Sequence, residues 1–417
     1  MPQDFTKDIQ YYKFCLYGFL KDLRFFEPFL ILFFLEKGFT FLQIGTLYAV
    51  REILINLMEI PTGVAADIIG RRRSLILSFL FYIFSFIIFF VSKQYYAFII
   101  AMLFYATGDA FRTGTHKAMI FEYLKIKGWK DQRVHYYGHT RSWSQMGAAV
   151  SALIAGVIVF YSGSFQYIFI YSTIPYFLDL LLVWSYPKIL DGDMSAIKVD
   201  GIRKRTKSVV REFLISFGNM HVIKAIANLS VHSGFHKAIK DYLQPVIQTF
   251  AFSLPILVGI AEKKRSALII GIIYFVVYIL TSYAARKAGK TTDKLNSIQK
   301  ALNVTMILGY LMAFASGLFF HYSFFIVSIV LYIGIFIIEN LRNPIGVAYV
   351  SELYKQDILA TALSANSQAK SLFAAIIAPI LGYLADTLGV GMGLAVLAFV
   401  LILSSPLYLA KRKTEVI

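Results

Sequence analysis

The sequence has few charged residues and almost no cysteine. Charged side chains make up 16% of its 417 residues, whereas soluble proteins carry about 25%. The single cysteine, Cys15, excludes an internal disulfide and a metal site built from several cysteines. Residues 1–12 lack a basic segment followed by a cleavage site, so we expect the first apolar helix to remain in the mature protein.

Motifs of enzymes and of nucleotide-driven pumps are also missing. The sequence contains no nucleophile elbow and no phosphate-binding loop of the form Gly-x4-Gly-Lys-Ser/Thr. His232 and His236 have the i, i+4 spacing of a metal-binding pair, but no clear third ligand accompanies them. We therefore expect neither an enzyme nor an ATP-driven pump, and no metal or cofactor.

Hydrophobic residues form 58% of the chain and gather in about a dozen long blocks. A block of roughly 20 apolar residues can cross the hydrocarbon core of a bilayer. We therefore predict an all-α integral membrane protein of the cell (cytoplasmic) membrane, with twelve transmembrane helices. The predicted helices are residues 11–35, 42–64, 74–92, 95–122, 134–160, 165–186, 219–250, 267–285, 300–320, 322–350, 360–385 and 391–410.

The net charge of +17 could indicate nucleic-acid binding or an excess of basic residues in cytoplasmic loops. With a cytoplasmic N-terminus, the inner connections hold 23 Lys and Arg residues and the outer connections hold 5. This asymmetry predicts that both termini are cytoplasmic, and it accounts for the charge without a nucleic-acid partner. The basic cluster 263–265 departs from the rule, either because it lies outside or because the segment 219–250 is longer or broken after Pro255.

A polar stretch, residues 188–217, divides the chain into two predicted six-helix bundles, residues 1–187 and 218–417. We expect this stretch to be a cytoplasmic linker. The fourth predicted helix of each bundle repeats the pattern acid-x-x-Arg-x9-Glu. The residues are Asp109, Arg112 and Glu122 in the first bundle and Glu339, Arg342 and Glu352 in the second, offset by 230. Such a repeat indicates duplication, with a substrate site between the halves near the midplane.

Residues 63–73 read Gly-Val-Ala-Ala-Asp-Ile-Ile-Gly-Arg-Arg-Arg. This stretch resembles the signature Gly-x-x-x-Asp-x-x-Gly-Arg-Lys/Arg between the second and third helices of the major facilitator superfamily. The two glycines permit close backbone approach and a tight turn. The resemblance implies that Gly63, Asp67, Gly70, Arg71 and Arg72 act in conformational change, holding the halves together in the outward-facing state.

The resemblance extends less specifically to two further helices. Arg112 looks like the fourth-helix arginine that many proton-coupled members use, although with Asp109 it could equally serve the motif loop as a latch. The Gly-rich segment 147–156 is similar to a helix of drug/proton antiporters but lacks its Gly-Pro pair. Glu122 and Glu352 lie near predicted cytoplasmic ends, where a latch is the favoured role.

Charged residues interrupt the apolar blocks 11–35, 95–122, 219–250 and 322–350, the helices that line the cavity in the superfamily that the sequence resembles. An ionisable group at bilayer depth is costly and normally faces the bundle interior. Lys21-Asp22 before Pro28 is echoed by Lys240-Asp241 before Pro245. The candidates for substrate or proton contact are Asp22, Arg24, Glu27, Asp109, Arg112, Arg141, Lys240, Asp241, Glu339 and Arg342. The first three could instead form a structural ion-pair network, and Asp179 is expected to be buried structure.

These observations predict a secondary transporter that moves a small or amphipathic molecule by alternating access. Proton coupling follows from the buried carboxyl groups beside cations, and efflux is slightly favoured over uptake on the family resemblance alone. A lipid mover or a substrate-sensing receptor on the same fold is the alternative. We expect a monomer whose partners are a small molecule, protons and the bilayer.

Overall fold

The computed structural model describes residues 5–129, 132–191, 220–255, 259–353 and 356–410, and in these residues the chain is helical without strands. Most of the predicted linker 188–217 lies outside the described residues. The helices of the first part are α1 (Ile9–Lys21), η1 (Glu27–Phe29), α2 (Leu30–Glu36), α3 (Phe41–Ile69), α4 (Arg71–Val91), α5 (Tyr95–Arg112), α6 (Thr115–Ile126), α7 (Arg133–Ser162), α8 (Tyr167–Trp184) and η3 (Lys188–Asp191). Those of the second part are α10 (Met220–Ile239), η5 (Lys240–Tyr242), α11 (Leu243–Ser253), α12 (Glu262–Arg286), α13 (Ala288–Leu295), α14 (Ile298–His321), α15 (Phe325–Leu353), α16 (Gln356–Leu388), α17 (Val390–Ser404) and η6 (Ser405–Tyr408).

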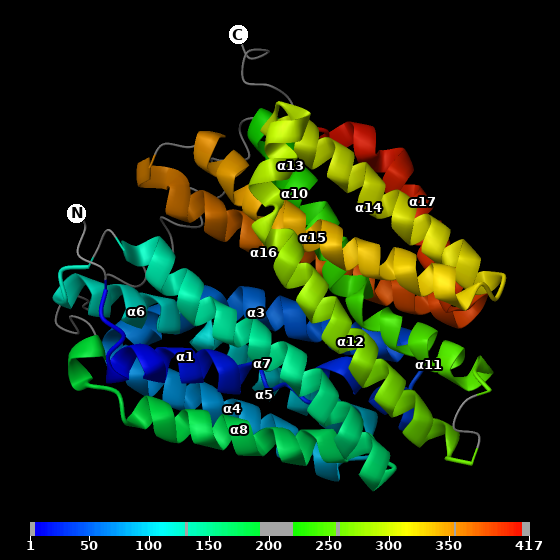
Figure 1. Ribbon diagram of the computed structural model, residues 1–417, viewed down its shortest axis with the longest axis horizontal. Coiled ribbons are helices and arrows are strands. Elements are labelled where there is room, and N and C mark those ends of the chain that lie inside the picture. The colour runs from blue at the N-terminus through cyan, green and yellow to red at the C-terminus, as the bar shows by residue number, and fades with distance from the viewer. Residues whose placement is uncertain (1–4, 130–131, 192–219, 256–258, 354–355, 411–417) are drawn as a thin grey trace. The chain divides into compact units, whose positions relative to one another are not determined.

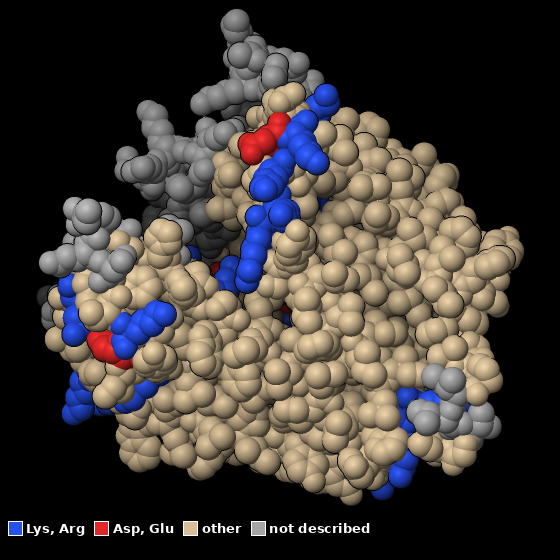
Figure 2. Space-filling view, in the orientation of Figure 1, with Lys and Arg blue, Asp and Glu red and all other residues tan. Residues whose placement is uncertain are grey.

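Nine helices in the described part of the chain are long and apolar enough to cross a membrane. They lie in α3, α4, α7, α8, α12, α14, α15, α16 and α17. Large apolar side chains such as Phe84, Ile174 and Leu403 are exposed on these helices, as expected for surfaces that face lipid. Figure 2 shows a surface largely free of charge, with a band of Lys and Arg over α13. The chain is therefore a multi-pass membrane protein.

The chain forms two compact units, and each is built from two separate stretches of the sequence. Unit 1 contains residues Met1–Phe29 and Leu54–Thr206, and unit 2 contains Leu30–Ile53 and Lys207–Ile417. Helix α2 and the first half of α3 therefore pack with the second part of the chain.

The two units repeat the same neighbour relationships (Figure 1). In unit 1, α1 packs against α7, and α4 packs against both α5 and α8. In unit 2, α10 packs against α16, and α14 packs against both α15 and α17. Because these helices also occur in the same order, the packing agrees with the duplication that the acid-x-x-Arg repeat indicates.

Two predicted helices are broken where their charged residues lie. The segment predicted as 11–35 ends its first helix at Lys21 and resumes after the short turn Glu27–Phe29. The segment predicted as 219–250 is interrupted by the turn Lys240–Tyr242. A proline, which cannot donate a backbone hydrogen bond, lies at each break: Pro28 within the first turn and Pro245 just after the second. Broken helices at membrane depth are tolerated where they are buried in protein or line a cavity.

In unit 2, a carboxylate from α16 holds the start of α3. The two oxygens of Asp386 accept hydrogen bonds from the backbone N–H groups of Phe41 and Leu42, each at 2.8 Å. Thr40 and Gln43 bond reciprocally, side chain to backbone, and form a capping box. The first turn of α3 is thereby fully satisfied, and a negative charge lies at the positive end of the helix.

Glycines bring the same two helices close together. A Cβ atom added to Gly45 of α3 would lie 2.4 Å from the carbonyl oxygen of Ala378, and one added to Gly382 of α16 would lie 2.3 Å from that of Phe41. Neither position leaves room for a larger residue unless the backbones separate. The Asp386 contact is thus part of a tightly packed seam.

The basic cluster 263–265 has a structural explanation. It begins α12, and α11 ends at Ser253. The buried Arg265 donates hydrogen bonds to the carbonyl oxygens of Leu254 and Phe252, at 3.1 and 3.2 Å. Lys263 pairs with Glu36. These residues therefore serve unit 2 itself, closing the end of α11 and binding the end of α2.

We predict that Asp386→Asn lowers the stability of unit 2, because the amide keeps only one good acceptor and loses the negative charge. The expected loss is about 1 kcal/mol, the usual effect of removing a helix cap. Thermal unfolding of the purified protein in detergent measures it. Asp293→Asn, at an exposed position of α13, is the matched control and should unfold like the wild type. Equal unfolding temperatures for all three proteins would contradict the prediction.

Candidate functional site

A chain of charged residues occupies the break after α1 in unit 1. Lys21 lies 2.8 Å from Asp22, and Arg24 lies 3.6 Å from Asp22 and 3.9 Å from Glu27. The side chains are between 16% and 24% exposed. The structure therefore brings the predicted residues Asp22, Arg24 and Glu27 into one alternating cluster, in which every charge has an opposite neighbour.

A second group of charges lies in the last turn of α5. The guanidinium of Arg112 donates a hydrogen bond to Asp109, and the hydroxyl of Tyr82 donates to the same carboxylate at 2.7 Å. Arg112 also donates to the Tyr82 oxygen at 3.0 Å. The i, i+3 spacing on one helix brings the charges together, and Tyr82 on α4 completes a closed triad.

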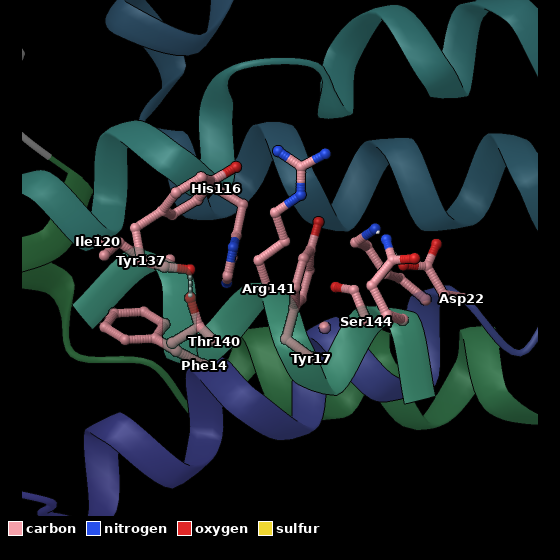
Figure 3. Close-up of a pocket in the computed structure, with 12 residues that line it drawn as sticks. Phe14, Tyr17, Asp22, His116, Ile120, Tyr137, Thr140, Arg141 and Ser144 are labelled. Atoms are coloured by element: carbon pink, nitrogen blue, oxygen red, sulfur yellow. Dashed lines mark hydrogen bonds and ion pairs between the residues drawn. The ribbon is translucent and has the colours of Figure 1, made fainter. Parts of the chain in front are cut away.

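A cavity of about 320 Å³ opens in unit 1 between α1, α6 and α7. Figure 3 shows Tyr17 and Asp22 on the α1 side, His116 on α6, and Arg141 and Ser144 on α7. Lys21 also lines the cavity. Arg141 is exposed and has no ion-pair partner in the described residues. The cavity thus presents two cations and one carboxylate to an occupant.

Aromatic rings and small residues shape this cavity. The rings of His116 and Tyr17 stack at a centroid distance of 3.5 Å and an angle of 9°. A Cβ atom added to Gly147 would lie 2.4 Å from the carbonyl oxygen of Phe19. The backbones of α1 and α7 therefore approach each other closely. The Tyr17–His116 stack provides a flat face beside the charges.

The motif loop 63–73 joins α3 to α4 within unit 1. Gly70 has φ 94°, a conformation that favours glycine, and it makes the expected tight turn. A Cβ atom added to Gly63 would meet nothing within 4 Å, so the close approach expected there is not seen in the described part of unit 1. Asp67 lies within α3, and its side chain lies outside the described residues.

The arginines of this loop bind the neighbouring helices of unit 1. Arg71 lies 3.8 Å from Glu122, one of the expected latch residues. The backbone N–H of Arg72 donates to Asp191 at 2.7 Å, and its guanidinium donates to the carbonyl oxygen of Tyr186 at 3.2 Å. The second expected latch residue, Glu352, is in α15, but its side chain lies outside the described residues.

Of the corresponding charges in unit 2, one pair repeats the pairing seen in unit 1 and the acid of the repeat has a different partner. Lys240 pairs with the buried Asp241 at 3.1 Å. Glu339 lies 3.0 Å from Nδ1 of His232, which is buried. In unit 1 the acid and the arginine of the repeat therefore pair with each other. In unit 2 the acid, Glu339, pairs with His232 instead.

Arg342 of α15 links its own helix to α14 and α10 by hydrogen bonds. It is 2% exposed and donates hydrogen bonds to Leu302 and Thr305 of α14 and to Asn228 of α10. Asn228 in turn bonds Asn303 and the carbonyl oxygen of Tyr408. These contacts favour a role in holding α10, α14 and α15 together over direct contact with a substrate.

One buried cluster of unit 2 was missed by the sequence reasoning. Glu52, which is 1% exposed, accepts hydrogen bonds from Lys237 of α10 and from Arg51 at 3.1 Å. Lys237 also donates to Ser371 of α16 at 3.2 Å, and the Arg51 guanidinium lies over the Tyr48 ring. The adjacent Arg51-Glu52 inside an apolar block was the available signal.

Comparison with known proteins agrees with this architecture. The family model of the Major Facilitator Superfamily matches residues 22–372. The chain is 25% identical over 398 residues to an uncharacterized MFS-type transporter, YxaM, of Bacillus subtilis (strain 168), covering 92% of this chain and 90% of the relative.

Solved structures share the fold at low sequence identity. A mutant of the nucleoside transporter NupG matches with a TM-score of 0.73 and 15% identity, covering 95% of this chain and 96% of the other. A POT family transporter in complex with a thioalcohol conjugated peptide matches with a TM-score of 0.70 and 16% identity, covering 95% and 93%. Together with the family model over most of its length, this shows that the chain belongs to the Major Facilitator Superfamily of membrane transporters.

Proposed function

We propose that this protein is a proton-coupled secondary active transporter that moves a small polar or amphipathic molecule by alternating access. It acts through twelve transmembrane helices in two six-helix halves, with both termini in the cytoplasm. Efflux is the slightly favoured direction, on the family resemblance alone. The observation that carries the proposal is the coincidence, in unit 1, of a helix break, a partly buried ion-pair cluster and a cavity.

The cavity chemistry supports a small substrate with charges of both signs. Its volume of about 320 Å³ falls at the lower end of the range of roughly 300–1,000 Å³ for small-molecule sites. Lys21 and Arg141 suit an anionic group, Asp22 suits a cationic one, and the Tyr17–His116 stack suits a flat or apolar part. Structural relatives that bind peptides or 5-aminolevulinic acid, and one that transports nucleosides, suggest the compounds to try first.

The ion-pair cluster supports proton coupling. A carboxylate surrounded by cations stays ionised, and it can take up a proton when a conformational change removes its partner. Asp22 and Glu27 have such partners here in Lys21 and Arg24. Alternating access would rearrange these pairs as the substrate enters or leaves.

We predict exchange of labelled substrate across proteoliposomes without ATP, since a carrier equilibrates its substrate in both directions. A thermal-shift screen of nucleosides, short peptides and 5-aminolevulinic acid on the purified protein selects the compound, and counterflow measures the exchange. Binding without exchange would contradict the transporter proposal and favour the receptor.

Arg141→Gln should weaken the apparent affinity for a compound with an anionic group by about tenfold, because it removes one charge-assisted hydrogen bond. The maximum exchange rate should change less. Arg286→Gln, at an exposed position of α12, is the matched control. If both variants retain the wild-type affinity, Arg141 does not contact the substrate.

Asp22→Asn and Glu27→Gln should each reduce accumulation driven by a pH gradient, because each substitution removes one titratable carboxyl group and keeps its shape. Counterflow should continue in Glu27→Gln, which does not line the cavity, and should weaken in Asp22→Asn for a substrate with a cationic group. Uptake into proteoliposomes with an imposed pH gradient measures accumulation, and counterflow on the same preparation is the control for folding. Wild-type accumulation by both variants would exclude these residues from coupling.

A further inference from the structure

Asp179 is a buried carboxyl group that the ion-pair clusters of unit 1 do not use. It lies in the middle of α8 and is 0% exposed. Neither of its carboxyl oxygens has a hydrogen-bond partner among the described residues. The hydroxyl of the nearly fully buried Tyr17 is likewise without a partner. Most buried polar groups are hydrogen-bonded, so this site is an exception that requires an explanation.

Ionisation sets the main constraint at this position. A bare carboxylate in a low-dielectric interior is strongly unfavourable unless a cation or several donors accompany it. Asp22, Glu27 and Asp109 meet this condition, because each has a cationic partner. Asp179 does not meet it, so the observed arrangement suits a neutral, protonated carboxyl group.

The charges near Asp179 come from the end of α1, which packs on α8, and from α5. Helix α1 and its end supply Lys21 and Asp22, and α5 supplies Arg112. Helix α1 also contributes the neutral Tyr17, and Tyr82 of α4 packs against Tyr176 of α8. Tyr176, one turn before Asp179, donates its hydroxyl to the carbonyl oxygen of Lys21 at 3.2 Å, which fixes α8 against the end of α1.

Lys21 is the cation that two carboxyl groups can share. In this structure its ammonium group pairs with Asp22 at 2.8 Å. Lys21 and Asp22 line the cavity, whereas Asp179 does not. To exchange one carboxylate partner for the other, the Lys21 side chain would turn from Asp22 toward α8.

We propose that Asp179 is a further proton-binding residue of unit 1, besides Asp22 and Glu27, occluded and neutral in this conformation, and that Lys21 alternates between Asp22 and Asp179 during transport. When the site opens to water of low proton concentration, the O–H bond of Asp179 breaks and the proton passes to water. The resulting carboxylate then pairs with the ammonium of Lys21. Asp22 keeps only its longer contact with Arg24 and can accept a cationic group of the substrate. This inference rests on the proposed transport function and specifies a further coupling residue.

Infrared spectroscopy of the purified protein tests the protonation state without any substrate. We expect a protonated-carboxyl carbonyl band at neutral pH in the wild type and in the exposed control Asp293→Asn. Asp179→Asn should lose this band. Size-exclusion chromatography checks that this variant folds, and Asp179→Glu should restore a protonated-carboxyl band. A wild-type band that survives in folded Asp179→Asn, or a wild type without the band, would overturn the proposal.

The Lys21 exchange has its own signature. In Asp22→Asn the ammonium of Lys21 loses its partner and should turn to Asp179, so the band should weaken at neutral pH and return on acidification. A residue that only fills space, or that holds a trapped water, would give the same band in Asp22→Asn as in the wild type. That result would exclude the exchange.

Transport measurements separate this inference from the proposed function. With the compound selected by the thermal-shift screen, Asp179→Asn should retain counterflow and lose accumulation driven by a pH gradient. If the wild type accumulates substrate and Asp179→Asn accumulates it equally, the inference fails and the transporter stands. If the wild type shows no counterflow with any bound compound, the transport function fails, and the infrared result still reports the state of Asp179.

Discussion

The cost of placing charge inside a membrane governs the arrangement of this protein. An ionisable side chain at bilayer depth must find an opposite charge, a set of donors or water, or else become neutral. Unit 1 satisfies this condition with the run from Lys21 to Glu27 and with the Asp109–Arg112 pair. Asp179 of unit 1 lacks such a partner in the described residues, so a neutral carboxyl group meets the condition there.

The duplicated pattern has diverged in its use of the same residue types. In unit 1 the acid and arginine pair with each other beside Tyr82. In unit 2 His232 takes Glu339, and Arg342 is committed to acceptors on α10 and α14. Unit 1 therefore keeps an Asp109–Arg112 pair that can separate when either residue changes partner. In unit 2 the equivalent Arg342 is held by hydrogen bonds to neighbouring helices.

The sequence predicted the membrane class, the superfamily and the charged segments, because long apolar blocks and a spaced loop motif are local features. It did not predict the helix breaks at Lys21 and Lys240, although the following prolines and the charges signalled them. Lys237, the distant partner of Glu52, and the helix start that Asp386 binds are each more than 180 residues away along the chain, and no local pattern indicates such contacts. The hydrogen bonds of Arg342 to α10 and α14 were also not predictable, because the pattern acid-x-x-Arg is the same in both halves.

The Asp386 contact also bears on how the protein is made. The amides of Phe41 and Leu42 are synthesised 345 and 344 residues before the carboxylate that holds them. At about 5–20 residues per second, this interval lasts roughly 20 to 70 seconds. During that time the Thr40–Gln43 capping box can protect part of the first turn, while the other two donors depend on interfacial water. Unit 2 is therefore completed only after α16 has entered the bilayer. Early termination of synthesis would leave the start of α3 without the Asp386 contact.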